Sequence, residues 1–246
     1  MKAIILNAGK GARLAPVTNS APKCLTDVGG RPIFSHQLDA IVTEGIQNVV
    51  VVVGYRKEDV INYAIRHYPQ VDFTFVENIE FGSTNTAYSL LLTRREIDDE
   101  ILYLNGDVLL DSDLLHRILG SPHKNALAVR LGPCGREEVK VITAGDRILA
   151  IGKELSTAQA AGEFLGVARF SQETAWNLMT ALQYVVHREQ RVKAYFEEGL
   201  DRIAQGVPLE MVDASELPCI EIDFPEDLER AQRECLPRLR REVVSA

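Results

Sequence analysis

"MKAIILNAGKGARLAPVTNSAPKCL" (residues 1–25) passes from a short apolar run into glycine, basic and proline residues. Residues 2–6 predict a parallel strand covered on both faces, because their apolar side chains do not alternate with polar ones. Gly9 and Gly11 lack a Cβ, so the backbone there can lie directly against a ligand. Successive amide N–H groups in such a turn form a nest for phosphate oxygens. The stretch therefore predicts a strand that ends in an anion-binding loop.

Strands and helices alternate after this loop. Three more apolar runs predict strands, and segments with helical spacing separate them, in the order 32–46 (helix), 48–54 (strand), 57–68 (helix), 71–78 (strand), 85–97 (helix) and 100–110 (strand). This alternation indicates a doubly wound α/β sheet, mixed but mostly parallel. Ligands of such sheets bind beyond the carboxyl ends of the strands. Polar loops begin at four such ends, at Asn7, Asn78, Asn105 and Asp223.

The second half of the sequence is less regular. It predicts, in order, a β-hairpin, a strand, a mainly helical region, two short strands and a helix, at 138–152, 162–170, 172–205, 209–214, 219–224 and 225–235. We expect this half to continue the sheet. At 246 residues and 46% apolar, the chain can bury a core as one domain, 1–246.

Composition excludes several classes of protein. The net charge of −8 argues against a nucleic-acid binder, although residues 1–31 hold five basic residues and one acidic residue. No apolar stretch approaches the length of a membrane span, and the amino terminus lacks a secretory signal, so we expect a cytoplasmic protein. The four cysteines lie far apart in the sequence, which argues against zinc and against a disulfide framework.

Three common kinds of glycine loop fit these residues poorly. A dinucleotide-binding loop needs G-x-G-x-x-G and an acidic residue after the second strand, but the third glycine is absent and that strand ends at Gly54. A Walker loop fails because no G-x-x-x-x-G-K-[ST] exists. An ordinary glycine turn with surface lysines does not account for Arg13-Leu14, Pro16, Thr18 and Pro22-Lys23 together.

The segment 6–25, LNAGKGARLAPVTNSAPKCL, resembles the signature G-x-G-x-R-L-x-P-x-T-x-x-x-P-K of nucleotidyltransferases that make activated sugars and alcohols. Three later segments resemble the same family, namely NGDVLL (105–110), GDRILAIGKEL (145–155) and LPCIEIDFPEDLERA (217–231). The last is similar to the phosphocholine cytidylyltransferase-like branch, although Cys219 stands where many relatives carry an aromatic residue. The resemblance implies CTP as nucleotide, a small phosphorylated acceptor, and a division into a nucleotide-binding half (1–120) and an acceptor-binding half (121–246).

Nucleotidyl transfer needs an acceptor phosphate in line with the leaving pyrophosphate, so catalysis rests on positioning and on charge neutralisation. Mg²⁺ binds such phosphates with one or two carboxylates. Asp107 and Asp223 each follow an apolar strand and are the expected metal ligands. We expect Lys23 to offset charge on the α-phosphate and Arg13 to hold the β- and γ-phosphates. Lys153 would orient the acceptor phosphate, with Lys140 as a weaker candidate.

The base is expected between the loop that follows the first strand and the loop that follows the third strand and begins at Asn78. The nucleotide-binding candidates are Leu6, Asn7, Ala8, Gly9, Lys10, Gly11, Arg13, Lys23, Asn78, Gly82, Ser83, Thr84, Asn85 and Asp107. Thr84 or Ser83 could instead start the following helix as its cap. The acceptor candidates are Lys140, Lys153, Phe164, Tyr195, Glu197 and Glu221, with Glu198 beside them. Aromatic faces and carboxylates suit a cationic amine.

Alternative functions remain open on the sequence alone. Within the class, the alternative is a hexose-1-phosphate enzyme that uses UTP or dTTP. Outside it, the chain could be a nucleotide-binding regulatory module without turnover, although intact Lys23, Asp107 and Asp223 argue for catalysis. The oligomeric state also stays open, with a homodimer as one option.

Overall fold

The computed structural model of the protein describes residues 1–19 and 21–239. Its strands are β1 (Lys2–Asn7), β2 (Asn48–Val53), β3 (Asp72–Glu77), β4 (Ile101–Asn105), β5 (Val108–Leu109), β6 (Ala126–Leu131), β7 (Lys140–Ala144), β8 (Arg147–Gly152), β9 (Gly162–Phe170), β10 (Glu210–Asp213) and β11 (Ile220–Glu221). Its α-helices are α1 (Ile33–Thr43), α2 (Lys57–His67), α3 (Thr86–Leu92), α4 (Ser112–Leu119), α5 (Gln172–Gln183), α6 (Glu197–Ala204) and α7 (Pro225–Arg230).

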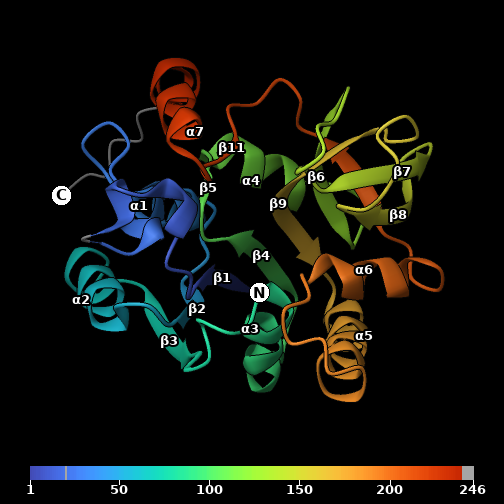
Figure 1. Ribbon diagram of the computed structural model, residues 1–246, viewed down its shortest axis with the longest axis horizontal. Helices are drawn as coiled ribbons and strands as arrows, with labels where there is room; N and C mark the ends of the chain where they lie inside the picture. Colours follow the sequence, from blue (N-terminus) through green and yellow to red (C-terminus); the bar gives the residue numbers. More distant parts are fainter. Residues whose placement is uncertain (20, 240–246) are drawn as a thin grey trace.

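One nine-stranded sheet runs through the molecule in the order β3-β2-β1-β4-β9-β6-β10-β8-β7 (Figure 1). Strands β1 to β4 pair in parallel, and β9 enters antiparallel between β4 and β6. Within the described chain only β8 and β9 run against the other strands of this sheet. The predicted doubly wound, mostly parallel α/β sheet is confirmed.

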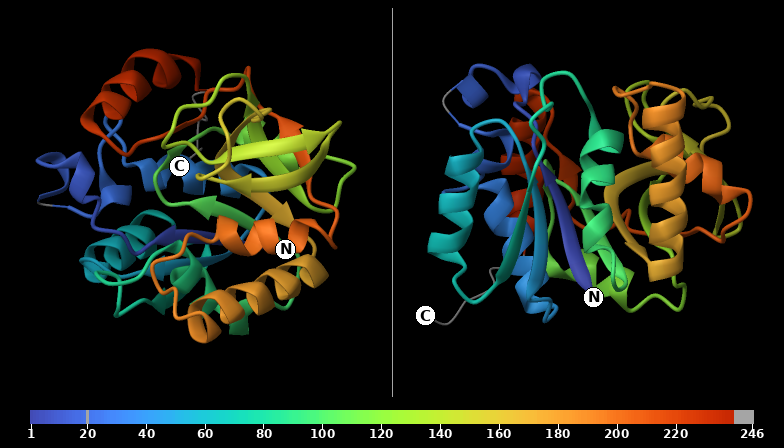
Figure 2. Two further views of the ribbon diagram at one scale, coloured as in Figure 1. Left: turned by 45° about the vertical axis from the view of Figure 1, so that its right-hand side comes forward. Right: turned by 90° about the horizontal axis from the view of Figure 1, so that it is seen from below.

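Helices cover both faces of the sheet (Figure 2). The alternation of side chains along β1 explains why, since successive residues point to opposite faces. Ile4 and Leu6 pack in the core on the side of α3, α5 and α6, whereas Ala3 and Ile5 pack on the side of α1, α2 and α4. A strand buried in this way needs apolar residues throughout.

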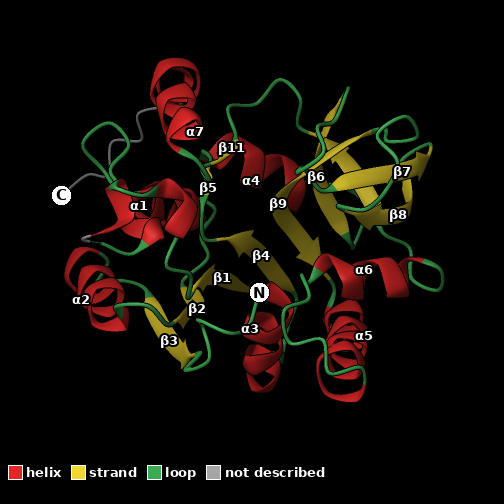
Figure 3. Ribbon diagram, in the orientation of Figure 1, coloured by secondary structure: helices red, strands yellow, loops and turns green. Residues whose placement is uncertain are grey.

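The predicted strands at 100–110 and 219–224 differ in detail from the structure. The first is interrupted at Gly106 and Asp107, so that it forms β4 and β5. The second is reduced to β11, which pairs antiparallel with β5 in a separate two-stranded sheet beside α7 (Figure 3). Leu109 and Ile220 pack there with Leu14, so the closing segment is anchored under the amino-terminal loop.

No helix in the described part of the chain has both the length and the apolar character that a bilayer span requires.

Candidate active site

The glycine loop after β1 is folded onto the stem of Lys23. Gly11 has a φ of 68°, in the left-handed region that glycine tolerates best. A Cβ on Gly11 would lie 2.8 Å from the Cβ of Lys23, so no larger residue fits. The Thr18 hydroxyl donates a hydrogen bond of 2.7 Å to the Gly11 carbonyl. The signature residues Gly11, Thr18 and Lys23 thus fix one another, which the sequence spacing alone could not show.

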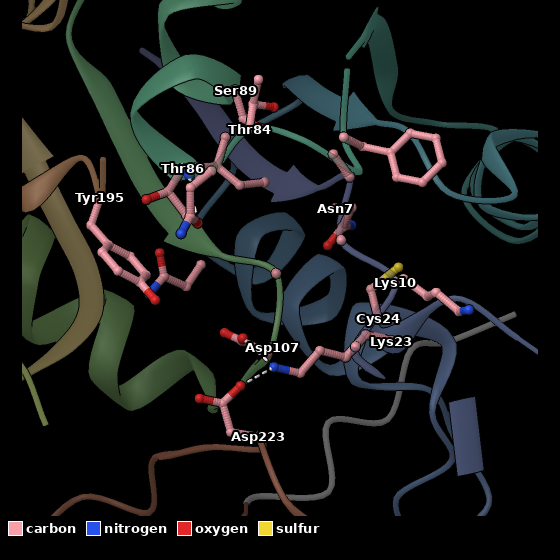
Figure 4. A pocket seen from close by; sticks show the side chains of 18 of the residues that line it. Asn7, Lys10, Lys23, Cys24, Thr84, Thr86, Ser89, Asp107, Tyr195 and Asp223 are labelled. Atoms are coloured by element: carbon pink, nitrogen blue, oxygen red, sulfur yellow. Dashed lines mark hydrogen bonds and ion pairs between the residues drawn. The ribbon is translucent and has the colours of Figure 1, made fainter. Parts of the chain in front are cut away.

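Lys23 joins two aspartates that are far apart in the sequence. Its Nζ lies 2.6 Å from Asp107 Oδ2 and 2.5 Å from Asp223 Oδ1 (Figure 4). An Arg13 nitrogen lies 2.7 Å from the other oxygen of Asp223, and the guanidinium stands over the ring of Phe224. Asp107 follows β4 and Asp223 follows β11, so three separate parts of the chain meet at this point.

The charges of this cluster stabilise one another. Burial works against the ammonium of Lys23, but Asp107 and Asp223 outweigh it and raise the pKa of Lys23 above its ordinary value. Burial likewise works against the carboxylate of Asp223, but Lys23 and Arg13 lower the pKa of Asp223. Both groups are therefore ionised at neutral pH.

A cavity of about 730 Å³ opens above this cluster. It is lined by all but one of the predicted nucleotide residues: Leu6, Asn7, Ala8, Gly9, Lys10, Gly11, Arg13, Lys23, Asn78, Gly82, Thr84, Asn85 and Asp107. Ser83 is the exception, because its hydroxyl turns to the Glu80 carbonyl and carboxylate. A Cβ on Gly9 would meet nothing within 4 Å, so the loop leaves open space there.

The loop between β3 and α3 forms another part of the cavity wall. The Asn78 amide donates to Thr84 Oγ1 and to Ser89 Oγ, at 3.0 Å each, and its oxygen accepts from the Glu80 N–H. The helix cap is Asn85, whose side chain accepts from Thr86 N, so the prediction of Thr84 or Ser83 as the cap is corrected. Asn85 stands immediately before the first helical residue, whereas the Ser83 and Thr84 hydroxyls donate to the Glu80 carbonyl.

The acceptor candidates Lys153, Tyr195, Glu197 and Glu221 also line the cavity. The Lys153 ammonium lies 4.7 Å from the centre of the Tyr195 ring, and Figure 4 shows Tyr195 across the cavity from Lys23. Burial raises the pKa of Glu197 to about 7, and its Oε2 has no hydrogen-bond partner among the described residues. Burial and the nearby charge of Asp107 raise the pKa of Glu221 as well.

A second hollow of about 840 Å³ continues from this side of the cavity. The two share Val139, Lys153, Tyr195 and Glu197, and the second also includes Glu198. The cavity therefore has one part at the glycine loop and an extension toward α6.

Two acceptor candidates lie outside both hollows, which corrects their predicted position. Lys140 is 1% exposed, and its ammonium donates to the carbonyls of Arg136, Glu138 and Lys153, so it holds the hairpin together. Phe164 is 1% exposed and packs against Phe196 in the core. Lysine and phenylalanine side chains serve structural roles as readily as binding roles, and the sequence could not separate the two.

Three residues that were not among the predicted site residues, Phe81, Thr86 and Asn105, also line the cavity. Phe81 packs edge-on to Tyr55, with 6.1 Å between ring centres, and borders the cavity beside Gly54. Phe81 stands in the polar loop already considered, so an aromatic residue there was the available signal. Asn105 links Tyr103, whose hydroxyl donates to it, with Glu221, which accepts from its amide.

The residues present fit a magnesium ion. Two carboxylate oxygens that touch one nitrogen at 2.6 and 2.5 Å are close enough to share one small cation. Asp107 Oδ1 is buried and has no hydrogen-bond partner in the described chain, so lone pairs remain for a ligand. Hard carboxylate oxygens are the donors that Mg²⁺ prefers.

A sequence model of the family described as Nucleotidyl transferase matches residues 2–138. The chain belongs to the nucleotidyl transferase family. This confirms the family resemblance of the glycine loop and of the NGDVLL segment, both of which lie within the match.

Two relatives show how the sequence of this chain is shared. A CMP-5'-(3-aminopropyl)phosphonate synthase of Streptomyces rubellomurinus is 36% identical over 128 residues, which is 52% of this chain and 20% of that protein. A UTP–glucose-1-phosphate uridylyltransferase of Haloferax volcanii is 37% identical over 114 residues, which is 46% of each chain. The match thus spans a fifth to about half of these relatives.

Solved structures share the nucleotidyl transferase fold over nearly the whole chain. The inositol-1-phosphate CTP transferase of T. maritima has a TM-score of 0.81 at 23% identity, over 99% of this chain and 98% of that one. The CTP:phosphocholine cytidylyltransferase of Streptococcus pneumoniae has a TM-score of 0.78 at 21% identity, over 94% and 97%. At these identities the likeness concerns the fold.

Proposed function

We propose that the protein transfers CMP from CTP to a small phosphorylated acceptor and releases pyrophosphate. One observation carries this proposal: the Lys23 ammonium, held by Asp107 and Asp223, stands at the base of a cavity walled by the glycine loop. A cation fixed at the point where phosphate charge develops stabilises the transition state without further reorganisation.

The residues divide the task by position. The amides of the glycine loop and Arg13 bind the β- and γ-phosphates, and Lys23 offsets charge on the α-phosphate. Lys153, on the opposite wall, orients the acceptor phosphate toward the α-phosphorus. Transfer then forms one P–O bond from the acceptor oxygen while the bond to pyrophosphate breaks.

Asp107 and Asp223 would hold Mg²⁺. When bound, the ion supplies positive charge to the phosphates and orders their oxygens. Lys23 contacts both carboxylates, so a bound ion would compete with its ammonium for them. An ammonium that is held less tightly by the carboxylates would be free to turn toward the nucleotide.

A pyrophosphate-release screen tests the proposal. It crosses CTP, UTP, dTTP, ATP and GTP with phosphocholine, aminoethylphosphonate, inositol phosphate, glutamine phosphate and hexose phosphates. We expect turnover with CTP and with an acceptor from the first four. Turnover with no pair would refute the function and favour the regulatory module.

The second candidate is a hexose-1-phosphate uridylyl- or thymidylyltransferase. The Haloferax volcanii uridylyltransferase, the more identical of the two relatives described, supports it. Preference for UTP or dTTP with a hexose phosphate in the same screen would establish this candidate and exclude the first.

A further inference from the structure

Unpaired polar atoms gather beneath the loop that carries Asp107. In the described chain, six buried side-chain nitrogen and oxygen atoms find no hydrogen-bond partner. Four of them belong to Asn7 (both amide atoms), Gln37 (Oε1) and Asp107 (Oδ1). Such atoms are costly to leave unpaired, so their concentration in one place calls for a physical cause.

Contacts place all three side chains at the turn between β4 and β5. The Gln37 amide donates to the carbonyls of Asn105 and Val108, at 2.7 and 2.9 Å, on either side of Asp107. Asn7 Oδ1 lies next to Gly106, since a Cβ added to Gly106 would be 2.1 Å from this oxygen. Asn7 is 3% exposed, on the lining of the cavity, and Gln37 is fully buried.

The unpaired atoms are chemically complementary. Asn7 Nδ2 is a donor, whereas Gln37 Oε1 and Asp107 Oδ1 are acceptors. One water molecule can accept from the Asn7 amide and donate to both oxygens, and buried waters typically make about three such bonds.

We propose that Asn7 and Gln37 are positioning residues for Asp107, acting through an internal water that joins the three side chains. They fix the carboxylate in the orientation from which it meets Lys23 and the metal ion. This inference rests on the proposed metal-dependent transfer, but it concerns the ligand-free protein. Partners of metal ligands in this position typically affect metal affinity by about 10- to 100-fold.

The test is a titration of Mn²⁺ against the full chain without nucleotide, with free Mn²⁺ followed by electron paramagnetic resonance. Asn7→Leu removes both polar atoms at nearly constant volume, and Gln37→Met does the same for Gln37. We expect each variant to raise the Mn²⁺ Kd at least about tenfold. The matched control is Asn125→Leu, because the buried Asn125 amide pairs with Pro208 and Ser171 outside both hollows; its Kd should stay within about twofold of wild type.

CTP binding in EDTA separates this role from direct contact with nucleotide. We expect Gln37→Met, whose residue lies outside the cavity lining, to leave the CTP Kd within about twofold of wild type; a loss of CTP affinity that exceeds the loss of Mn²⁺ affinity would overturn the proposal. Unchanged Mn²⁺ affinity, or a wild type that binds no Mn²⁺, would overturn it too. If the transfer screen fails while the Mn²⁺ result holds, only the proposed function is lost.

A high-resolution crystal structure of the wild-type chain adds a measurement that no folding defect can obscure. It should show a water within hydrogen-bond reach of Asn7 Nδ2, Gln37 Oε1 and Asp107 Oδ1. The same three atoms unpaired, with no water between them, would refute the proposal.

Discussion

Lys23 works as an internal counter-ion before it meets any substrate. Its side chain is 13% exposed, and those of Asp107 and Asp223 are 24% and 23% exposed. Two carboxylates this close repel each other unless a cation lies between them, and partial burial weakens solvent screening. The lysine that we propose to assist transfer therefore also stabilises its own site.

Lys23→Met tests this double role. The variant keeps the apolar stem but removes the charge, and we expect it to lose about 2 kcal/mol of unfolding free energy in EDTA, below the cost of breaking a fully buried pair. That corresponds to a fall in Tm of about 4–8 °C. Mg²⁺ should raise the Tm of the variant more than that of wild type, because it replaces the missing cation. Transfer should fall by at least about 100-fold.

Lys57→Met is the control for this prediction. Lys57 pairs with Glu77 at 2.7 Å on the surface, and exposed pairs of this kind contribute little. Its Tm should match wild type with and without Mg²⁺. An unchanged Tm for Lys23→Met in EDTA would show that the aspartates do not depend on Lys23.

Glu197 makes the free energy of unfolding depend on pH. Burial raises its folded-state pKa to about 7, above the ordinary 4.5, so the folded chain binds the proton more tightly than the unfolded chain. Stability is then lost as the pH rises from about 4.5 to about 7. Glu197→Gln lacks this loss, so near pH 8 its free energy of unfolding should exceed that of wild type by no more than about 3 kcal/mol. Its Tm should be higher accordingly.

The difference should shrink toward zero near pH 5. Scanning calorimetry at several pH values measures this stability difference. Glu221 is present in both proteins, so its titration does not contribute to the difference. Glu198→Gln is the control, because Glu198 pairs with Arg191 at 2.5 Å at the edge of the hollow. A stability gap for Glu197→Gln that is equal at both ends of the pH range would contradict the assigned shift.

At the scale of elements, substitutions of the two loop glycines should distinguish an effect on stability from an effect on nucleotide binding. Gly11→Ala forces a Cβ against the Lys23 stem at a positive φ, and we expect a loss of about 1–2 kcal/mol together with weaker nucleotide binding. Gly9→Ala meets no atom within 4 Å, so its Tm should equal that of wild type. Its added methyl group stands where a phosphate must approach the backbone, so nucleotide affinity should still fall. Calorimetric titration with CTP and thermal melts of both variants check this.

If Gly9→Ala instead binds CTP with wild-type affinity, the triphosphate must lie away from the loop. That result would remove the main support for the proposed nucleotide position.

The sequence predicted the elements best where burial is uniform. The strands β1, β2 and β4 are continuous apolar runs because helices cover both of their faces, and such runs are visible without a structure. The pairing of β11 with β5 was not predictable, because it depends on contacts more than 100 residues apart in the chain.

The site was predictable to the extent that it follows the signature. Lys23, Asp107 and Asp223 were expected together, and the structure brings them into direct contact. Lys140 was misplaced because the carbonyls that hold its ammonium come from the hairpin, which no local pattern reveals. Asn7 was expected as a nucleotide-binding residue, but neither Asn7 nor Gln37 carried a signal for its contact with the turn between β4 and β5, since an amide packed against a loop has no periodicity of its own.

At the scale of the whole molecule, the division into a nucleotide half and an acceptor half does not coincide with a structural boundary. Strand β9, from the second half, pairs with β4 of the first half. The core on the α3 side likewise joins Ile4 with Phe170 and Leu200. Asp223 comes from the second half and meets Lys23 of the first, so neither half holds a complete site.

This continuity predicts one cooperative unfolding transition for the full chain. Scanning calorimetry should give a calorimetric enthalpy equal to the van't Hoff enthalpy, because no part of the sheet can open without exposing the edge of another. CTP with Mg²⁺ should move the whole transition to higher temperature, since a ligand that binds only the folded state stabilises all of it. Two resolved transitions, with only one of them shifted by the nucleotide, would instead mean that the halves fold separately and that the β4–β9 pairing contributes little to their union.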